Sequence, residues 1–584
     1  MNLSPKARIA VLSLPLSDEF TLVPDVSALA VQQALEQLDG QRLDLVLLPQ
    51  YAVKESSDPA EQSKLELLYA FAGRNGCYIV FNSLRETDEG RRCVSTIIGR
   101  NGSFQGEYVK THRLEGMDIE LSLGDDLPVF ALDFGRVALM AGSDLFIPEV
   151  AEMYSIKGAE LLLCSLGTQV LRDDTEIHRQ LKGRAVANYC FVAASAYASD
   201  QPMYMASNVS VMHANPAHID VTGDASATFN AFGLGKHTGR AAAYDLRGET
   251  IASTGRESGY AVCELPMEKK RDASRYLFGI GCILTHQNER GVFRELGRPA
   301  VYDGKRYPVE KPVFGFVHIG YQQTILSRQD DWYVGILAQV EEAAKRSDIV
   351  VCSEYSRGDN GQAETVGLPE FLQGCSELAR TYRCYVAVNE ALQGMNTSLL
   401  FDRDGGLVHK HQKVNPLNMM YEKKLPAGDA IDVVETDFGR IGFMICADTY
   451  CQEIPRIHAL KGAEIILIQS QSWGYDANAI NEGFSRAWAI ENCAFVVMSN
   501  FPTSQVAHRT NVIDPTGETV FATNYDRAGL YTFQLDLEAV RRKPSYMLED
   551  GIVRQDFTYR SRIMHARRPE LYGLLTGSAE EARL

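Results

Sequence analysis

The feature that most limits the folds open to this chain is an internal repeat. The tetrapeptide DFGR occurs at 133–136 and again 304 residues later at 437–440. The same spacing relates three longer pairs of segments: IKGAELLLCS (156–165) and LKGAEIILIQ (460–469), NYCFVAASA (188–196) and NCAFVVMSN (492–500), and DLVLLPQY (44–51) and DIVVCSEY (348–355). Two copies of about 280 residues are too few and too long for a solenoid. The repeat therefore predicts two homologous domains in tandem.

The join between the copies is rich in glycine, proline and charged residues. It reads GRPAVYDGKRYPVEKP and spans 297–312, a composition typical of segments that connect domains. A chain of 584 residues also exceeds what one hydrophobic core usually organises. We therefore predict a first domain at 1–290, a linker at 291–311 and a second domain at 312–584.

Short apolar runs alternate with amphipathic stretches in both copies. Runs rich in β-branched residues, such as VALMAG (137–142) and IGFMIC (441–446), are typical of buried strands. Apolar residues three and four positions apart, as in YVGILAQVEEAAKR (333–346), are typical of helices. The alternation predicts an α/β fold in which helices cover sheets.

The composition argues against several classes of partner. The net charge of −17 disfavours nucleic acid, which would require a basic face. No run of about 18 apolar residues occurs, so we expect no membrane span, and the N-terminus lacks the apolar core of a secretory signal. Twelve cysteines are scattered without a C-x-x-C spacing, which is typical of reduced thiols. We therefore expect a cytoplasmic protein with neither a nucleic-acid nor a membrane partner.

Three chemically useful residues follow the ends of apolar runs in the second copy. Glu354 ends DIVVCSE, Lys413 lies in HKHQKVNP, and Cys446 ends IGFMIC. Functional groups of α/β sheets gather beyond the carboxyl ends of the strands. Once together, the carboxylate can accept the thiol proton, while the ammonium favours the thiolate and holds an oxyanion. The backbone N–H of Ala447 is a second candidate donor to that oxyanion.

These segments resemble the signatures of the nitrilase superfamily, the carbon–nitrogen hydrolases. The resemblance covers nearly all of both copies and rests on DIVVCSEY, HQKVNP and IGFMICADTYCQE. It implies two tandem α-β-β-α sandwich domains, a catalytic triad of Glu354, Lys413 and Cys446, and no metal or organic cofactor. The second glutamate of the family corresponds to Glu422, which would position Lys413 or the attacking water.

The resemblance also bears on assembly and has local exceptions. Members of the family commonly pair through a helix face, which implies intramolecular pairing of the two copies and leaves further homo-oligomerisation open. The chain departs from the family pattern at Ser353, Gln452 and Trp488. None of these departures removes a residue of the triad.

The first copy lacks this chemistry. The repeat aligns Gln50, Lys110 and Gly142 with the three triad positions. Glutamine cannot act as a general base and glycine carries no nucleophile, so we predict a silent first domain. The side chain of Ser143, one residue further along, should leave the turn in a different direction.

The position that corresponds to Glu422 in the first copy is open between two residues. A slip of one residue in the alignment allows either Asp118 or Glu120.

Other residues near the motifs have two readings. Tyr355, Tyr450 and Trp473 could line the substrate pocket or fill core. We expect Cys352 and Cys451 to be packing residues.

The histidines near the lysine motif suggest no metal site. We expect His409, Lys410 and His411 to be solvated, and no third ligand stands at a metal-binding spacing from the two histidines.

The substrate class follows from the residues after the nucleophile. Ala447-Asp448 resembles the amide-hydrolysing branches of the family, while carbamoylases often place an arginine just after the cysteine motif, where this chain has only Arg456 nearby. The resemblance thus favours a small linear amide, cleaved through a thioester on Cys446 to a carboxylate and ammonia or an amine. An N-carbamoyl amidohydrolase or a nitrilase is the alternative within the family, and a catalytically inert scaffold or binding protein is the alternative of another class.

Overall fold

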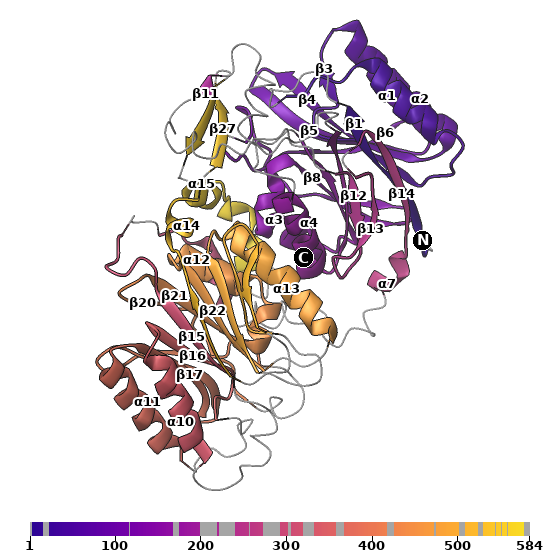
Figure 1. Ribbon diagram of the computed structural model, residues 1–584. Helices are drawn as coiled ribbons and strands as arrows, with labels where there is room; N and C mark the ends of the chain where they lie inside the picture. Colours follow the sequence, from indigo (N-terminus) through magenta and orange to yellow (C-terminus); the bar gives the residue numbers. More distant parts are fainter. Residues whose placement is uncertain are drawn as a thin grey trace. The chain divides into compact units, whose positions relative to one another are not determined.

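The computed structural model forms two units (Figure 1). The first contains residues 1–279 and 544–574, and the second contains 280–543 and 575–584. The structure describes residues 3–15, 23–115, 117–167, 175–198, 219–220, 240–255, 257–271, 292–301, 305–318, 332–357, 367–416, 425–471, 475–501, 509–523, 529–543, 545–549, 552–556 and 559–576.

The second unit contains two six-stranded sheets. In the first sheet the strands follow the order β19-β18-β17-β16-β15-β26, and in the second β20-β21-β22-β23-β24-β25. The first sheet consists of β15 (Val313–His318), β16 (Ile349–Cys352), β17 (Tyr385–Leu392), β18 (Met395–Phe401), β19 (Leu407–Gln412) and β26 (Gly529–Gln534). The second consists of β20 (Val433–Glu435), β21 (Arg440–Ile445), β22 (Ile465–Ser470), β23 (Phe495–Asn500), β24 (Asn511–Ile513) and β25 (Thr519–Ala522).

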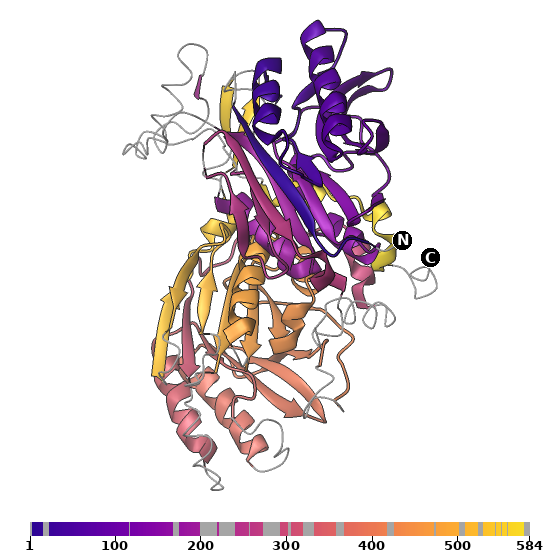
Figure 2. The ribbon, with the colours of Figure 1, turned by 90° about the vertical axis from the view of Figure 1, so that its right-hand side faces the viewer.

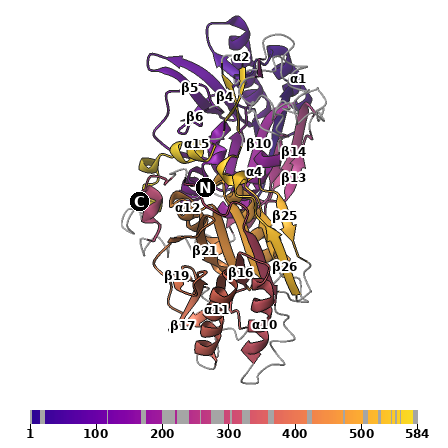
Figure 3. The same cartoon turned by 60° about the vertical axis from the view of Figure 1, so that its left-hand side comes forward.

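Helices cover both sheets of this unit. Helices α10 (Trp332–Ala344) and α11 (Leu368–Tyr382) lie side by side against the first sheet (Figures 2 and 3). Helices α12 (Glu453–Leu460) and α13 (Tyr475–Glu491) pack on β21 and β23 of the second. Apolar residues from both sheets, among them Phe316, Phe443 and Leu467, form one core between them. The predicted α-β-β-α sandwich is therefore confirmed.

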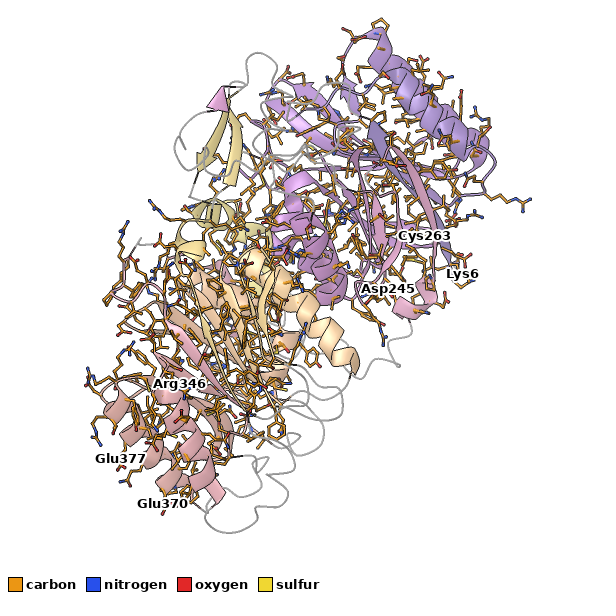
Figure 4. All side chains as sticks on the ribbon, in the orientation of Figure 1. Lys6, Asp245, Cys263, Arg346, Glu370 and Glu377 are labelled. Carbon is orange, nitrogen blue, oxygen red and sulfur yellow. The ribbon has the colours of Figure 1, made fainter. Side chains whose placement is uncertain are left out.

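The amphipathic pattern of α11 explains how a helix attaches to the sheet. Its buried residues Phe371, Cys375 and Ala379 recur four apart and join the core with β16 and β17. Glu370 and Glu377 are exposed on the same helix, and both point away from the sheet (Figure 4). The sequence of the helix thus fixes which side faces the core.

The first unit repeats the strand order of both sheets and has one more strand, β3, which pairs with β4. One sheet has the order β6-β5-β4-β2-β1-β14, the other β7-β8-β9-β10-β12-β13, and a parallel β1–β10 pairing joins them. The strands are β1 (Ala7–Pro15), β2 (Leu45–Leu47), β3 (Val53–Glu55), β4 (Tyr78–Thr87), β5 (Gly90–Ile98), β6 (Phe104–Val109), β7 (Val129–Leu132), β8 (Gly135–Ala141), β9 (Leu161–Ser165), β10 (Phe191–Ala198), β12 (Ala242–Tyr244), β13 (Thr250–Ser253) and β14 (Gly259–Leu265). The helices are α1 (Ala28–Leu38), α2 (Pro59–Asn75), α3 (Pro148–Ile156), α4 (Thr175–Asn188) and α7 (Met267–Arg271).

Residues 544–574 of the C-terminal segment belong to the first unit. They contain β27 (Ser545–Glu549), β28 (Ile552–Asp556), α15 (Tyr559–His565), η6 (Pro569–Leu571) and the first two residues of α16 (Gly573–Thr576). Strand β28 pairs with β11 (Ile219–Asp220); β11 and β27 are labelled in Figure 1. Arg567 Nε lies 2.6 Å from Glu149 Oε1 in a buried ion pair. The hydroxyl of Tyr572 lies 2.7 Å from Nε2 of His112.

A segment between the copies belongs to the second unit in the same manner. The short helix η3 (Val292–Gly297) packs on α12 with Phe293 and Leu296 buried. Lys461 Nζ contacts Glu295 at 2.6 Å, and Val301 N donates to the carbonyl of Leu460 at 2.7 Å. In the structure the join belongs to the second unit and residues 544–574 belong to the first. The sequence instead predicts domains at 1–290 and 312–584 with a linker at 291–311, so the two divisions differ at both places.

The remaining helical elements are short. They are η1 (Gly142–Phe146), η5 (Cys446–Tyr450) and α14 (Glu538–Arg541). Across the described ranges, no helix has the length and apolar character that crossing a bilayer requires.

Three histidines that are buried or partly buried lead us to predict that the fold loses stability in acid. Burial lowers the pKa of His318 and of His409 from 6.5 to about 4, and that of His112 to about 3. Because the unfolded chain binds protons at these sites before the folded chain does, stability should fall as the pH drops from 6.5 towards 4. Urea unfolding followed across this range checks the prediction, and His318→Gln should flatten part of the slope. A free energy of unfolding that stays constant from pH 6.5 to 4 would contradict it.

Candidate active site

The three triad candidates lie just beyond the ends of their strands. Glu354 follows β16, Lys413 follows β19, and Cys446 follows β21 directly. Strands β15, β16 and β17 run parallel, as do β21, β22 and β23, so each set presents its carboxyl ends at one edge. This topology explains why residues 59 and 92 positions apart in sequence can meet.

Glu354 is held by donors from three different segments. Lys413 Nζ donates to Oε1 at 2.9 Å, and both side chains are almost completely buried. The amide of Asn396 donates to the same oxygen at 2.8 Å. The backbone N–H of Gln471, which follows β22, donates to Oε2 at 2.9 Å. A buried carboxylate that accepts three such bonds is held in one orientation.

Cys446 occupies a sharp turn between a strand and a helix. Its φ angle is +41°, a left-handed conformation that costs a residue with a Cβ about 1–2 kcal/mol. Of the eleven cysteines that the structure describes, ten are buried, whereas Cys446 is partly exposed. The turn therefore brings a thiol towards solvent at an energetic cost, which is typical of a reactive residue.

Tyr450 is the last residue of η5, the short helix that begins at Cys446. The pKa of Tyr450 is raised to about 12, first by burial and then by charge on Cys446, while Lys413 opposes the rise. The phenol therefore stays neutral at any ordinary assay pH. It can act as a hydrogen-bond donor in the site but not as an anion.

Asp448 holds the turn that carries the nucleophile candidate. Its carboxylate accepts from the N–H of Ile445 at 2.9 Å and from the N–H of Asn415 at 2.7 Å. The side chain of Asn415 donates to the carbonyl of Ala447 at 2.7 Å. These bonds tie the lysine and cysteine segments together. The role of Ala447 as an oxyanion donor stays a prediction.

The structure describes some of the other residues near the motifs and leaves others undescribed. Tyr355 is buried at φ +48°, and its N–H donates to Asn389 Oδ1 at 2.8 Å. Glu422 and Trp473 lie outside the described residues. Cys352 and Cys451 are buried.

The expectation of solvated residues around Lys413 is wrong for one of them. His411 is buried, with Nε2 3.3 Å from Asp448 Oδ2, because side chains of β19 alternate between its two faces. Lys410 is exposed, and His409 is intermediate. No three His, Cys, Asp or Glu residues of the described ranges are grouped so as to hold a metal ion.

The arginine nearest the cysteine motif has structural contacts. Arg456 is buried in α12, and its Nη1 donates to the carbonyl of Glu491 at 3.0 Å. The repeat aligns Trp488 with Arg184 of the first copy, whose guanidinium donates to Gln180 Oε1 at 2.7 Å.

In the silent copy, Gln50 fills the space that a nucleophile would need. A Cβ added to Gly142, or one added to Gly167, would clash with Oε1 of Gln50 unless the glutamine side chain moved. Gly142 keeps the left-handed turn at φ +51°, which glycine adopts without steric cost. Glycine at position 142 therefore avoids the backbone strain that a residue with a Cβ, such as Cys446, carries at the same turn of the second copy.

The lysine of the silent copy is locked in a buried polar cluster. Lys110 Nζ donates to Ser143 Oγ at 3.0 Å and to Asp144 Oδ1 at 3.3 Å, and Asp118 lies 3.8 Å away. Glu120 is exposed and pairs with Arg113. Asp118, not Glu120, is therefore the residue of the first copy that lies by the lysine.

A double-mutant cycle tests the closed state of the silent site. Gly142→Ala should destabilise the first unit by about 1–3 kcal/mol, because the new Cβ meets Gln50 and the turn is left-handed. Gln50→Ala in the same chain should recover part of this loss, which thermal unfolding measures. Strictly additive effects would show that Gln50 does not fill the space.

Comparison with known proteins gives the family. The carbon–nitrogen hydrolase model matches two segments, 19–275 and 334–544. The chain belongs to the carbon–nitrogen hydrolase family. The two segments correspond to the two copies of the repeat, so both copies, the silent one included, are of carbon–nitrogen hydrolase type.

Similar members of the family include nitrilases and amidases. A probable nitrilase of Schizosaccharomyces pombe is 29% identical over 24% of this chain and 53% of its own length. An omega-amidase of Mus musculus is 24% identical over 37% of this chain and 87% of its length. A 2-oxoglutaramate amidase of Bacillus subtilis is 28% identical over 34% of this chain and 82% of its length.

Coverage of the first curated relatives is partial, and structural similarity is distant. The chain spans about half the length of several curated relatives: 53% of the Schizosaccharomyces pombe nitrilase, 40% of an omega-amidase of Arabidopsis thaliana and 54% of an omega-amidase of Saccharomyces cerevisiae. A solved amidase from Nesterenkonia sp. AN1 in complex with acrylamide aligns with a TM-score of 0.34 and 18% identity, over 47% of this chain and 95% of that one.

Proposed function

We propose that the second copy hydrolyses a small linear amide through a thioester on Cys446. Glu354 accepts the thiol proton, and the thiolate forms a bond to the amide carbon. Lys413 and the N–H of Ala447 stabilise the resulting oxyanion. The C–N bond then breaks, and ammonia or an amine leaves with the proton from Glu354.

The second half of the reaction releases the acid. Water loses a proton to Glu354 and attacks the thioester carbon, and the C–S bond breaks to regenerate Cys446. Tyr450 is proposed to line the substrate pocket, together with Tyr355 and Trp473. Glu422 is proposed to orient Lys413 or this water.

The observation that supports this proposal most is the buried contact of Lys413 with Glu354, in a lysine segment that Asn415 ties to Ala447 and Asp448 of the turn that follows Cys446. A scaffold protein would have no need of a buried ion pair tied to the turn of a strained cysteine. The names of relatives, among them omega-amidase and 2-oxoglutaramate amidase, favour an amide over a nitrile or an N-carbamoyl substrate.

A substrate panel tests the proposal. The full chain is incubated with short aliphatic amides, 2-oxoglutaramate, N-carbamoyl amino acids and aliphatic nitriles, and the release of ammonia and acid is measured. Preferred turnover of the amides supports the proposal. Turnover of the carbamoyl compounds or nitriles alone would assign one of the alternatives, and no turnover at all would favour a binding protein.

We also propose that the silent copy serves as the permanent partner of the active copy. The family's tendency to pair supports this role. The fragment 280–543 tests it, since this range keeps η3 with the second unit. A fragment that is soluble, monomeric and fully active would exclude the role, whereas an aggregated, dimeric or weakly active fragment would support it.

A cytoplasmic location remains part of the proposal.

A further inference from the structure

A chain of buried amides leads back to the general-base candidate. The N–H of Tyr355, next to Glu354, donates to Asn389 Oδ1 at 2.8 Å. The Nδ2 of Asn389 donates to Asn396 Oδ1 at 2.9 Å, and the Nδ2 of Asn396 donates to Glu354 Oε1 at 2.8 Å. Asn389 and Asn396 are both buried, on the adjacent strands β17 and β18.

The direction of this chain fixes which end of the Asn396 amide meets the carboxylate. Because Asn389 donates to the oxygen of Asn396, the NH₂ group of Asn396 must point to Glu354. The opposite orientation would place an amide oxygen against a carboxylate. Asn396 is therefore an uncharged hydrogen-bond donor to Glu354, in addition to the charged donor Lys413.

The silent copy has changed at the same positions. The backbone donor of Tyr51 and the acceptor Asn82 are kept, at 2.9 Å. Cys93 now stands where the second copy has Asn396, and the amides of Gln50 and Asn82 both donate to its sulfur, at 3.4 and 3.3 Å. Where the second copy has the carboxylate of Glu354, which accepts from Asn396, the first copy thus has the amide of Gln50, which donates. Where the second copy has the donor Asn396, the first has the thiol of Cys93.

We propose that Asn396 is a positioning residue that orients Glu354 and keeps it ionised for proton transfer from Cys446. This inference rests on the proposed function. The paired change to Gln50 and Cys93 in the silent copy supports it, because a residue that only filled space would not change its hydrogen-bonding sense together with the base.

Other ionisable groups in the surrounding segments must stay constant in any test. In the described segments these include Lys413 after β19, Cys446 and Tyr450 in η5, the contact of His411 with Asp448 at 3.3 Å, and the ion pair of Arg357 with Glu390 at 3.1 Å. A change at position 396 leaves each of them in place. A shift in pH dependence can then be assigned to the lost donor.

The test compares Asn396→Ala, Asn396→Ser and Asn396→Asp in the full chain. We expect Asn396→Ala to lower kcat about 10- to 100-fold with little change in KM. The acidic limb of the kcat/KM profile should move to higher pH, because a carboxylate without this donor holds its proton more tightly. Asn396→Asp should move it further, and Asn396→Ser, which keeps a donor, should recover part of kcat.

Ser398→Ala is the matched control. Ser398 lies two residues further on the same strand face, is buried, and accepts from Asn389 at 3.3 Å. Its removal should leave the pH profile unchanged. An Asn396→Ala variant with the native profile, or equal effects of the two alanine variants, would overturn the proposal.

A second readout separates this inference from the proposed function. The rate at which iodoacetamide alkylates Cys446 is measured across pH for each variant, without any amide substrate. A shifted alkylation profile in Asn396→Ala supports the positioning role even if the substrate panel fails. An unshifted alkylation profile in a folded variant overturns it, and Asn396→Ser supplies the same readout if the alanine variant does not fold.

Discussion

Cys446→Ala should reduce amide hydrolysis by a factor on the order of 10⁴ or more, because no other group can form the thioester. The substitution also removes a side chain only partly exposed at a left-handed turn. Thermal stability should therefore change little. Initial rates of ammonia release on the best amide, measured with the melting temperature, check both expectations.

Cys451→Ala provides the control from the same segment. Cys451 is buried five residues after Cys446, and its truncation should cost about 1 kcal/mol of stability through a small cavity. The rate per folded molecule should stay near that of the native protein. Activity retained in Cys446→Ala, or lost equally in both variants, would contradict the assignment of the nucleophile.

Glu354→Gln should lower kcat about 10²- to 10⁴-fold, because an amide cannot accept the thiol proton. The substitution keeps the shape of the side chain and an oxygen for Lys413 and Asn396, so the fold should be retained. It also reproduces the Gln50 of the silent copy. The kcat/KM profile across pH, which should lose its acidic limb, provides the measurement.

The reactivity of the thiol adds a second measure for this variant. Alkylation of Cys446 by iodoacetamide near neutral pH should be slower in Glu354→Gln and should recover in alkaline solution, where the thiol ionises without a base. A variant that keeps more than a tenth of the native kcat/KM would show that Glu354 is not the base.

Much of the fold follows from the sequence because the repeat and the apolar periodicity are local signals. The predicted strand IGFMIC is β21, and the helix predicted within 333–346 is α10. The two copies share one strand order, as two homologous domains should. The membership of 545–574 in the first unit could not be predicted, because long-range packing leaves no periodic signal.

The site shows the same limit at the level of single residues. Motif spacing places Glu354, Lys413 and Cys446 at strand ends, where the structure has them. The link through Asn396 depends on the register of β17 with β18, which sequence spacing alone does not fix. His411 was misplaced because its inward orientation follows from strand alternation, and a polar motif hides that alternation.

The first copy keeps the strand order of the second although glutamine and glycine stand where the second has Glu354 and Cys446. Gly142 keeps the turn at lower strain, and Gln50 fills the space that opens. Lys110 is neutralised within the first unit by Asp144 and Asp118. The first copy therefore retains the packed architecture of a carbon–nitrogen hydrolase domain, and we predict that it lacks the chemistry.

The most direct test of this account is peptide mass spectrometry of the full chain quenched in acid during turnover of its best amide. The account predicts a mass increase equal to the acyl group on the peptide that contains Cys446, removed by neutral hydroxylamine as a thioester should be. No such adduct should occur in residues 1–290. An acyl group on Ser143 or on any residue other than Cys446, in a protein that hydrolyses the amide, would contradict it.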